Sequence, residues 1–371
     1  MTEPAADAGH MRHALALARR ALGNAAPNPA VGCVLVREGR VIGRGHTRPG
    51  GRPHAEAVAL GQATLRDRNA ARGATAYVSL EPCSHHGATP PCADALIGAG
   101  VARVVSALED PDPRVSGAGH ARLAAAGIAV EQGLLAEEAR QLNLGFILAV
   151  TEGRPLVAVK SAMSLDGRIA AGGDSRWITG PPARAAGHLA RARYDANAVG
   201  LGTATADDPR LDCRLPGLGA RAPLRVVFDS AAALDPRLDL AAAAGVRPTL
   251  LFCTEDAPAE RVARLADLGV TVVRTAAEEG RVALPAALRL LTEGGITRLL
   301  VEGGGTLIAA LLRANLVEVV LAHRAPILIG GDGVPAVGPL GLARVAEAPR
   351  FVAALSMRQG DDMVEYFLRR R

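Results

Sequence analysis

The residues His54-Ala55-Glu56, followed by Pro82-Cys83 and then by Cys92, decide how the first half of the chain is interpreted. One histidine and two cysteines provide three ligands, the number that a catalytic zinc ion takes from a protein while its fourth position stays open for water. Glu56 accompanies this ligand set and can move protons without binding the metal. The ligands and the carboxylate together predict a site for zinc-assisted chemistry.

The order of these residues, H-x-E followed by P-C and a second cysteine, is typical of zinc deaminases that act on bases. It predicts that an amino group on a pyrimidine-like or purine-like ring is replaced by oxygen. The cysteines are separated by residues 84–91, a longer insert than the C-x-x-C form has. Gly87 predicts a turn, and Thr89 predicts the cap of a helix over residues 89–99. Cys92 is then near a helix N-terminus, where the dipole favours a thiolate.

Two other interpretations of these residues stay open at this stage. His85 or His86 could act as a fourth ligand and close a structural zinc site, although such a site has no use for Glu56. Cys83 and Cys92 could form a disulfide, but the first residues show no secretion signal, and five cysteines in the chain indicate a reducing compartment. The remaining cysteines are expected in the core: Cys33, Cys213 and Cys253.

The composition indicates two globular domains. The chain has 371 residues, of which 49% are hydrophobic, and no apolar run is long enough to cross a membrane. The formal net charge is +5, and Lys160 is the single lysine, which is typical of a GC-rich genome. Aromatic residues make up only 2%, whereas proteins that hold single-stranded nucleic acid stack bases on aromatic side chains. The composition therefore favours a small substrate, and a phosphate on it would suit the arginines.

The first half alternates between helical and strand-like apolar patterns. Helices are expected over residues 5–22, 54–63, 89–99 and 119–126, and strands over residues 31–36, 40–45, 74–80, 103–107 and 128–131. Glu38-Gly39 predicts a hairpin, and Pro27-Asn28-Pro29 predicts a turn. The alternation predicts a layered α/β domain over residues 1–150, followed by a linker over residues 151–155.

The second half, residues 151–371, restarts with strands and predicts a second, mostly parallel α/β domain. Strands are expected over residues 156–161, 199–202, 224–228, 249–253, 270–274 and 298–302, with closing strands over residues 317–322 and 362–368 at an antiparallel edge. Helices are expected over residues 181–193, 259–268, 284–293 and 306–314, and residues 231–245 as loop or short helix. Gly303-Gly304-Gly305 lies between a strand and a helix, where glycines either hold an anion or allow close packing.

Motifs in both halves belong together. In the first half they are Pro27-Asn28-Pro29, Pro53-His54-Ala55-Glu56 and the segment from Glu81-Pro82-Cys83 to Pro90-Pro91-Cys92. In the second half they are Ser164-Leu165-Asp166-Gly167-Arg168, Ser175-Arg176-Trp177-Ile178-Thr179, the run from Thr203 to Pro209 and Val301-Glu302-Gly303-Gly304-Gly305. Over nearly its whole length the chain resembles the family of bifunctional riboflavin-biosynthesis deaminase–reductases, for which the long cysteine insert is typical.

This resemblance implies a cytidine-deaminase-like three-layer α/β domain, a dihydrofolate-reductase-like domain and two sequential reactions. The first domain would use Zn²⁺ to deaminate 2,5-diamino-6-(ribosylamino)-4(3H)-pyrimidinone 5′-phosphate hydrolytically. The second would use NADPH to reduce the ribosyl group to a ribityl group. Glu56 would take a proton from the water that zinc activates, deliver it to a ring nitrogen as the hydroxide attacks, and then protonate the departing amine in a second transfer.

The resemblance also implies which residues bind the small molecules, beside the ligands His54, Cys83 and Cys92 and the catalytic Glu56. NADPH would contact Ala162, Trp177, Thr203, Asp207, Ser230, Gly304, Gly305 and Thr306. The substrates would contact Asn28, Lys160, Ser175, Arg191, Leu211, Arg214 and Glu302. Alternatives stay open: Asn28 as a turn residue, Arg191 and Arg214 as solvated surface residues, and Lys160 as a chance survivor of the arginine bias.

We expect the partner to be a small phosphorylated pyrimidine, with no nucleic acid and no membrane, and the protein to be a cytoplasmic homo-oligomer. The alternative function is a nucleic-acid-editing zinc deaminase with an accessory domain, which needs a basic surface with aromatic residues beside the metal. A non-catalytic binding module is a second alternative, but such a module has no reason to keep Glu56 together with all three ligands.

Overall fold

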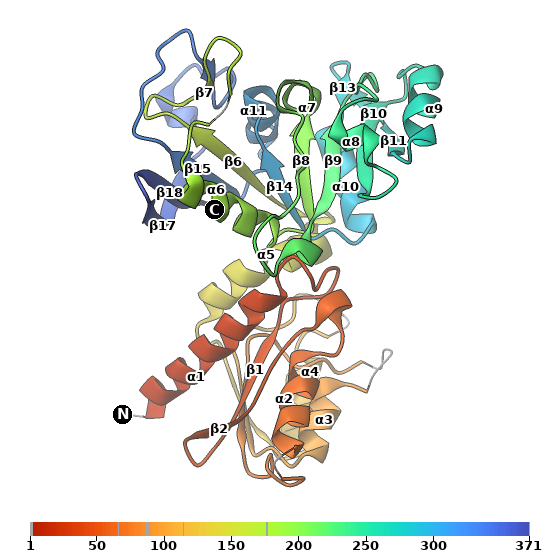
Figure 1. The fold of residues 1–371 in the computed structure, drawn as a ribbon. Coiled ribbons are helices and arrows are strands. Elements are labelled where there is room, and N and C mark those ends of the chain that lie inside the picture. The colour runs from red at the N-terminus through yellow and green to blue at the C-terminus, as the bar shows by residue number, and fades with distance from the viewer. Residues whose placement is uncertain (1–2, 66, 86–89, 114, 176, 371) are drawn as a thin grey trace. The chain divides into compact units, whose positions relative to one another are not determined.

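The computed structural model of the protein describes residues 3–65, 67–85, 90–113, 115–175 and 177–370 (Figure 1). Its contacts divide the chain into two compact units, Met1–Arg154 and Pro155–Arg371. Within the described ranges, no helix is both long enough and apolar enough to span a membrane.

The first unit is a five-stranded sheet between two layers of helices (Figure 1). Its strands are β1 (Gly32–Arg37), β2 (Arg40–His46), β3 (Thr75–Val78), β4 (Arg103–Ser106) and β5 (Ala129–Gln132). Its helices are α1 (Glu3–Ala18), α2 (Ala55–Thr64), α3 (Cys92–Gly98), α4 (Ala118–Ala125) and α5 (Ala136–Glu152), with 3-10 turns at Arg19–Ala21 and Pro49–Gly51. The strand order is β2-β1-β3-β4-β5; β1 runs antiparallel to β2 and β3, and β3, β4 and β5 are parallel.

Two boundaries in the first unit differ from the sequence prediction. Helix α5 continues through Glu152, so residues 151–152 of the expected linker are helical; the helix ends at Gly153, whose φ of 64° favours glycine. No proline interrupts α5, and its buried face keeps it regular to that point. Helix α3 starts at Cys92 with Pro91 as its N-cap, whereas the expected turn at Gly87 and cap at Thr89 lie outside the described residues.

Two glycines of β2 allow α2 to lie directly against the sheet. A Cβ atom at Gly43 would come within 2.3 Å of the Ala59 carbonyl oxygen, and one at Gly45 within 2.0 Å of the Ala55 carbonyl oxygen. Both neighbours are backbone atoms of α2, so any side chain here would push the helix outward. Because α2 carries Glu56 in its first turn, these glycines fix the distance of that carboxylate from the sheet.

The second unit contains a nine-stranded sheet in the order β11-β10-β9-β8-β14-β6-β15-β18-β17. These strands are β6 (Leu156–Met163), β8 (Ala196–Gly200), β9 (Leu224–Phe228), β10 (Thr249–Thr254), β11 (Thr271–Thr275), β14 (Arg298–Glu302), β15 (Val319–Arg324), β17 (Phe351–Gln359) and β18 (Asp362–Arg369). Short strands pair as β12 (Ala277–Glu278) with β13 (Arg281–Val282) and as β7 (Arg168–Ala170) with β16 (Val334–Pro335). The helices are α6 (Pro181–Arg191), α7 (Leu201–Asp207), α8 (Asp239–Ala242), α9 (Ala259–Asp267), α10 (Leu284–Glu293) and α11 (Gly305–Arg313), with 3-10 turns at Gly219–Arg221 and Val345–Glu347.

The mostly parallel sheet is confirmed. The strands from β11 to β15 are parallel, and β18 and β17 add the antiparallel edge. The strand expected over residues 199–202 is wrong by several residues, because Leu201 already begins α7. Strand β17 was not predicted: its side chains are exposed along most of its length, so no alternation of buried and polar residues marks it.

We predict that Gly45→Ala lowers the free energy of unfolding of the first unit by about 1–3 kcal/mol, because the new methyl group must displace α2. Gly61→Ala is the matched control, since this glycine lies within α2 and has no atom within 4 Å of the added Cβ. The control should gain up to ~1 kcal/mol from helix propensity. Urea unfolding measures both. Equal stability of Gly45→Ala and the wild type would contradict the close approach of strand and helix.

Candidate functional sites

The three predicted metal ligands meet in the first unit. The ligand atoms of His54, Cys83 and Cys92 all lie within 4.8 Å of one another. The His54 Nδ1 atom is 3.3 Å from Cys92 Sγ and 3.6 Å from Cys83 Sγ. For Zn–N and Zn–S bonds of about 2.1 and 2.3 Å, tetrahedral geometry places such atoms about 3.6 Å apart. The donor set and its spacing therefore fit zinc.

Three different segments bring the ligands together. His54 is the N-cap residue of α2, Cys83 follows the carboxyl end of β3, and Cys92 is the first residue of α3. The Cys92 amide donates a hydrogen bond to Cys83 Sγ at 3.3 Å, and the Ala93 amide donates one to the Cys83 carbonyl at 3.1 Å. The start of α3 thus holds Cys83 by its backbone N–H groups.

Glu81, which the sequence analysis did not assign, fixes the segment before Cys83. Its side chain is 3% exposed, and its two carboxylate oxygens accept four backbone hydrogen bonds. The donors are the amides of Asp110, Gly117, Gly119 and His120, at 2.8–3.2 Å. Because its partners are distant in sequence and are backbone groups, no spacing of side chains could reveal this role.

Charges in the metal cluster are strongly perturbed. Hydrogen bonding with Cys92, and further with His54, lowers the pKa of the Cys83 thiol to about 4 although burial opposes ionisation. The bond with Cys83 and burial raise the pKa of Cys92, so the pair carries one thiolate before metal binds. Burial, followed by the negative charge of Cys83, raises the pKa of Glu56 to about 7. A carboxyl group with this pKa can both accept and donate a proton near neutral pH.

The structure tests the disulfide and the His85 alternative for the cysteines, but not the His86 alternative. All five cysteines are free thiols, so Cys83 and Cys92 form no disulfide. His85 is exposed and is outside the ligand cluster of the described residues, whereas His86 lies outside the described residues. Cys33, Cys213 and Cys253 are buried, as the sequence predicted.

Asn28 lies against the loop that leads into His54. A Cβ atom at Gly51 would come within 2.0 Å of Asn28 Nδ2, so only a glycine at this position accommodates the amide. The backbone N–H of Asn28 also closes a turn by donating a hydrogen bond to the Ala25 carbonyl at 3.0 Å. The predicted turn is therefore present, and the side chain is half-buried beside the metal-binding segment.

The second unit has a cavity of about 1440 Å³ at the carboxyl ends of its parallel strands. Every residue of this unit that the resemblance implied lines it: Lys160, Ala162, Ser175, Trp177, Arg191, Thr203, Asp207, Leu211, Arg214, Ser230, Glu302, Gly304, Gly305 and Thr306. Pockets for one ligand measure about 300–1,000 Å³, so this cavity has room for a dinucleotide and a second molecule. Arg176, part of a quoted motif, lies outside the described residues.

A glycine turn forms one wall of this cavity. Gly303 and Gly304 both have φ of 75°, a conformation that favours glycine, and Gly304 is the N-cap of α11. A Cβ atom at Gly304 would lie 3.0 Å from Thr203 Oγ1, and one at Gly305 would lie 2.6 Å from the Pro335 carbonyl oxygen. Accessible backbone N–H groups at the start of a helix suit a pyrophosphate, so this wall fits the cofactor. The same glycines also allow close packing against Thr203 and Pro335.

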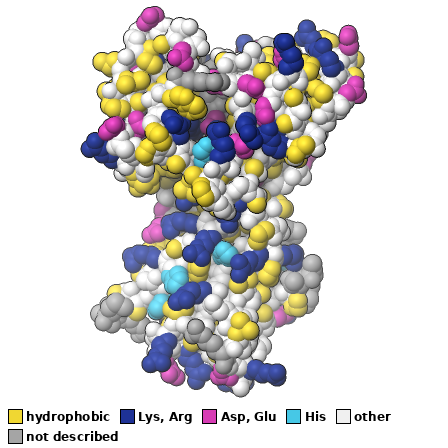
Figure 2. All heavy atoms as spheres, in the orientation of Figure 1, with side chains coloured by type: hydrophobic (Ala, Val, Ile, Leu, Met, Phe, Trp, Pro, Cys, Tyr) yellow, Lys and Arg dark blue, Asp and Glu magenta, His cyan; other side chains and the backbone are white. Residues whose placement is uncertain are grey.

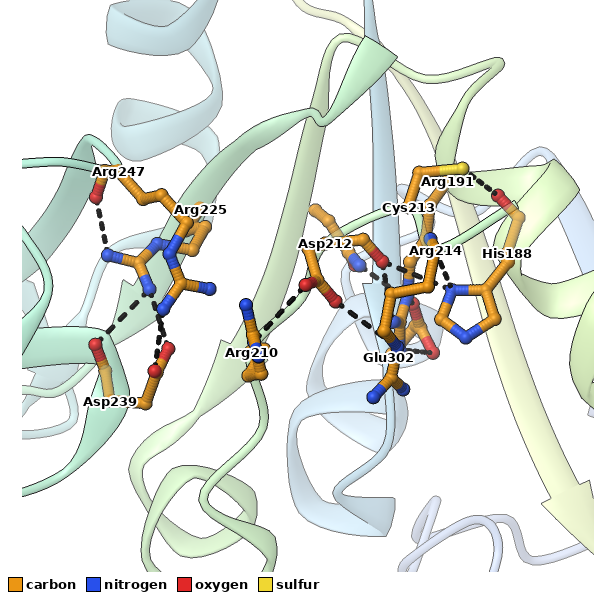
Figure 3. A network of polar contacts seen from close by, with 11 residues as sticks. His188, Arg191, Arg210, Asp212, Cys213, Arg214, Arg225, Asp239, Arg247 and Glu302 are labelled. Carbon is orange, nitrogen blue, oxygen red and sulfur yellow. Dashed lines mark hydrogen bonds and ion pairs between the residues drawn. The ribbon is translucent and has the colours of Figure 1, made fainter. Parts of the chain in front are cut away.

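A buried ionic cluster forms another wall. The Glu302 carboxylate accepts a hydrogen bond from Arg191 Nη2 at 3.0 Å (Figure 3). It also accepts one from Asn197 Nδ2 at 2.7 Å and lies 3.6 Å from Lys160 Nζ. Burial alone would raise the pKa of Glu302, but the charges of Arg191 and Lys160 hold it well below its ordinary value. The strand expected over residues 156–161 continues to Met163, so Lys160 lies inside β6. Asn197 was not predicted, because a polar residue within an apolar strand gave no distinct signal.

Asp212 organises the loop that carries Arg214 (Figure 3). Its carboxylate lies 3.2 Å from Arg210 Nε and 3.5 Å from Arg214 Nε, and both arginine side chains are 56% exposed. Its carbonyl oxygen accepts hydrogen bonds from Arg191 Nη1 at 3.0 Å and from His188 Nδ1 at 3.1 Å. The hydrogen-bond donors of Arg191 are therefore taken up by partners within the protein, whereas the guanidinium groups of Arg210 and Arg214 remain accessible to a ligand. His188 and Asp212 had no recognisable motif in the sequence.

The surface view agrees with a charged hollow in the second unit. On the face shown in Figure 2, acidic and basic side chains and a histidine gather around that hollow. On the first unit the visible basic side chains are separated by uncharged ones.

Two family models match the chain. Residues 155–363 match the model described as the RibD C-terminal domain. Residues 4–108 match the model described as the cytidine and deoxycytidylate deaminase zinc-binding region. The predicted fold class, a cytidine-deaminase-like domain with a dihydrofolate-reductase-like domain, and the predicted use of zinc and NADPH are confirmed.

Several relatives are similar to this chain over both units. The riboflavin biosynthesis protein RibD of Escherichia coli is 41% identical over 357 residues, which cover 93% of this chain and 94% of that protein. The structure of Acinetobacter baumannii RibD has a TM-score of 0.86 at 35% identity, with 100% of both chains covered. A diaminohydroxyphosphoribosylaminopyrimidine deaminase/5-amino-6-(5-phosphoribosylamino)uracil reductase of Thermotoga maritima has a TM-score of 0.85 at 34% identity, with 99% of both chains covered.

We predict that the purified protein holds about one zinc ion per chain and that Cys83→Ser and Cys92→Ser each lose most of it, because three ligands define this class of site. Elemental analysis after dialysis measures the loss. Cys253→Ala, which removes a buried thiol from the second unit, is the control and should keep its zinc. Full zinc content in both serine variants would refute the ligand assignment.

Proposed function

This chain belongs to the RibD family, and we propose that its own residues carry out the two reactions of a riboflavin-biosynthesis deaminase–reductase, one in each unit. The first is hydrolytic deamination of 2,5-diamino-6-(ribosylamino)-4(3H)-pyrimidinone 5′-phosphate. The second is NADPH-dependent reduction of the ribosyl side chain to ribityl. The observation that carries the proposal is the pairing, in one chain, of the His54–Cys83–Cys92 cluster with a separate cavity for a dinucleotide.

In the deaminase, His54, Cys83 and Cys92 would hold the zinc ion. When bound, zinc supplies Lewis-acid activation of a water molecule. Glu56 would accept a proton from the attacking water and pass it to the ring nitrogen. It would then carry the proton of the newly added hydroxyl group to the departing amine, and both tasks suit its pKa of about 7. The Asn28 amide, next to the His54 loop, would hold the pyrimidine ring through hydrogen bonds.

In the reductase, the chain's residues would position substrate and cofactor. NADPH supplies the hydride when bound. Lys160 would present its ammonium group to the sugar, held in place by Glu302 at 3.6 Å. Arg191 supports this indirectly, since it binds Glu302 and the Asp212 carbonyl, whereas the exposed guanidinium of Arg214 would bind the substrate phosphate. Ser175 and Leu211 would complete the substrate wall.

The cofactor would extend along the other lining residues. The glycine turn, Gly304-Gly305-Thr306, would take the pyrophosphate. Trp177 is 68% exposed, and its ring centroid lies 4.5 Å from the Arg184 guanidinium carbon, so it offers an aromatic face. Ala162, Thr203, Asp207 and Ser230 would supply the remaining contacts.

Members of this family act on a small phosphorylated pyrimidine, and the alternative of a nucleic-acid-editing deaminase is not favoured, because the relatives that span both units are riboflavin biosynthesis proteins. We further propose that the protein works in the cytoplasm without nucleic acid or membrane, and as a homo-oligomer. The oligomer is supported by the edge strand β17, on which Val352 and Leu355 are 53% and 47% exposed.

We predict that Glu56→Gln keeps its fold and its zinc but releases ammonia from the diamino substrate about 10²–10⁴-fold more slowly, because an amide cannot transfer protons. NADPH oxidation with the deaminated substrate should stay unchanged, since that cavity is lined by residues of the second unit. Glu138→Gln, at an exposed position of α5, is the charge-matched control. Ammonia release at the wild-type rate would remove Glu56 from the mechanism.

A further inference from the structure

We infer that Arg281 binds the 2′-phosphate of NADPH and makes the chain prefer NADP over NAD; this inference rests on the proposed reductase function. It assigns a specificity-determining role to a residue that neither the motifs nor the resemblance singled out.

Six arginines line the cavity, and five of them already have partners. Arg191 binds Glu302, and the others are bound as follows: Arg184 to the Thr179 carbonyl and the Trp177 ring, Arg210 and Arg214 to Asp212, and Arg313 to the Pro339 carbonyl. Arg281 is exposed and has no side-chain partner among the residues that the structure describes. Arg210 and Arg214 keep exposed donors, but their charges face Asp212. Among the lining arginines that the structure describes, Arg281 therefore differs in having neither a carboxylate nor a carbonyl partner.

Arg281 lies near the end of β9, whereas Glu302 ends β14, and β8 separates these two strands in the sheet. Arg281 belongs to β13, and the next residue, Val282, donates its amide to Ser230 Oγ at 3.2 Å. Ser230 follows the carboxyl end of β9, which is separated from β14 and its glycine turn by β8. In dinucleotide-binding α/β folds the pyrophosphate lies at the glycine turn and the adenosine ribose at the end of a strand further along the sheet. The same arrangement brings the ribose of NADPH to Ser230 and Arg281.

The acidic residue at this strand end is not available to a ribose. In NAD-specific sites a carboxylate here accepts hydrogen bonds from the ribose hydroxyls, and in NADP-specific sites a nearby arginine binds the 2′-phosphate instead. Asp229 directly follows β9, but it is 2% exposed and its carboxylate accepts the amides of Leu234 at 2.7 Å and Ala231 at 3.3 Å. The strand end thus offers a free guanidinium and no free carboxylate from Asp229.

The neighbouring carboxylate of Glu279 makes binding of the 2′-phosphate depend more strongly on Arg281. It lies on the same turn and also lines the cavity. Without Arg281, this end of the cavity would present a carboxylate to the phosphate, and the two negative charges would repel each other. Loss of Arg281 should therefore weaken the binding of a phosphorylated ribose more than loss of one hydrogen bond alone.

The test measures the dissociation constants of NADP⁺ and NAD⁺ for the full-length protein by isothermal titration calorimetry, so it does not depend on catalysis. The wild type should bind NADP⁺ more tightly. Arg281→Ala should weaken NADP⁺ binding by about 10–100-fold, as expected for loss of a charge-assisted contact, and should change NAD⁺ binding by less than about twofold. Arg281→Lys should retain part of the preference, because a point charge replaces a bidentate donor. Arg289→Ala, which removes an exposed arginine of α10 outside the cavity lining, is the charge-matched control and should leave both constants unchanged.

Each outcome decides a different point. An unchanged preference for NADP⁺ in Arg281→Ala overturns the assignment of Arg281 while leaving the reductase intact. An equal loss of both nucleotides in Arg281→Ala also overturns it, because a general defect of the cavity explains that result. If the wild type binds neither nucleotide, the proposed reductase function itself fails, and the inference fails with it.

Discussion

Burial of a carboxylate is the constraint on which both sites depend, and the two units resolve it in opposite ways. Burial of Glu56, together with the negative charge of Cys83, outweighs the stabilising charge of His54, so its pKa rises to about 7 and it can exchange protons. Glu302 is equally enclosed, but Arg191, Lys160 and Asn197 stabilise its charged form. The first carboxylate is thereby suited to move a proton, and the second to hold a fixed charge that orients its neighbours.

Both sites also use the carboxyl ends of parallel strands. Cys83 follows the end of β3, where the starts of α2 and α3 provide His54 and Cys92. In the second unit, the ends of β6, β8, β9 and β14 border one cavity. Loops at this edge carry side chains of distant segments to one point while the sheet behind them stays rigid, which is the general location of ligands in open α/β sheets.

The sequence predicted what local chemistry determines. The ligand set, Glu56 and the strand–glycine–helix segment at residues 298–314 each have a local pattern, and the structure has them in those elements. The continuation of α5 through Glu152 and the exposed strand β17 were not predicted. The point at which a helix ends and the pairing of an edge strand both depend on contacts with segments that are distant in sequence. Glu81, Asn197 and Asp212 were not predicted for the same reason: they act through partners that are distant in sequence or belong to the backbone.

The central claim is that one chain performs a deamination and then a reduction at two separate sites. It is tested most directly by incubating the purified protein with the diamino pyrimidine nucleotide, first without and then with NADPH, while ammonia and NADPH are both followed. Ammonia should appear without NADPH, and NADPH added afterwards should be oxidised in an amount matching the ammonia released. Oxidation of NADPH that runs ahead of ammonia release, or release of ammonia that requires NADPH, would contradict it.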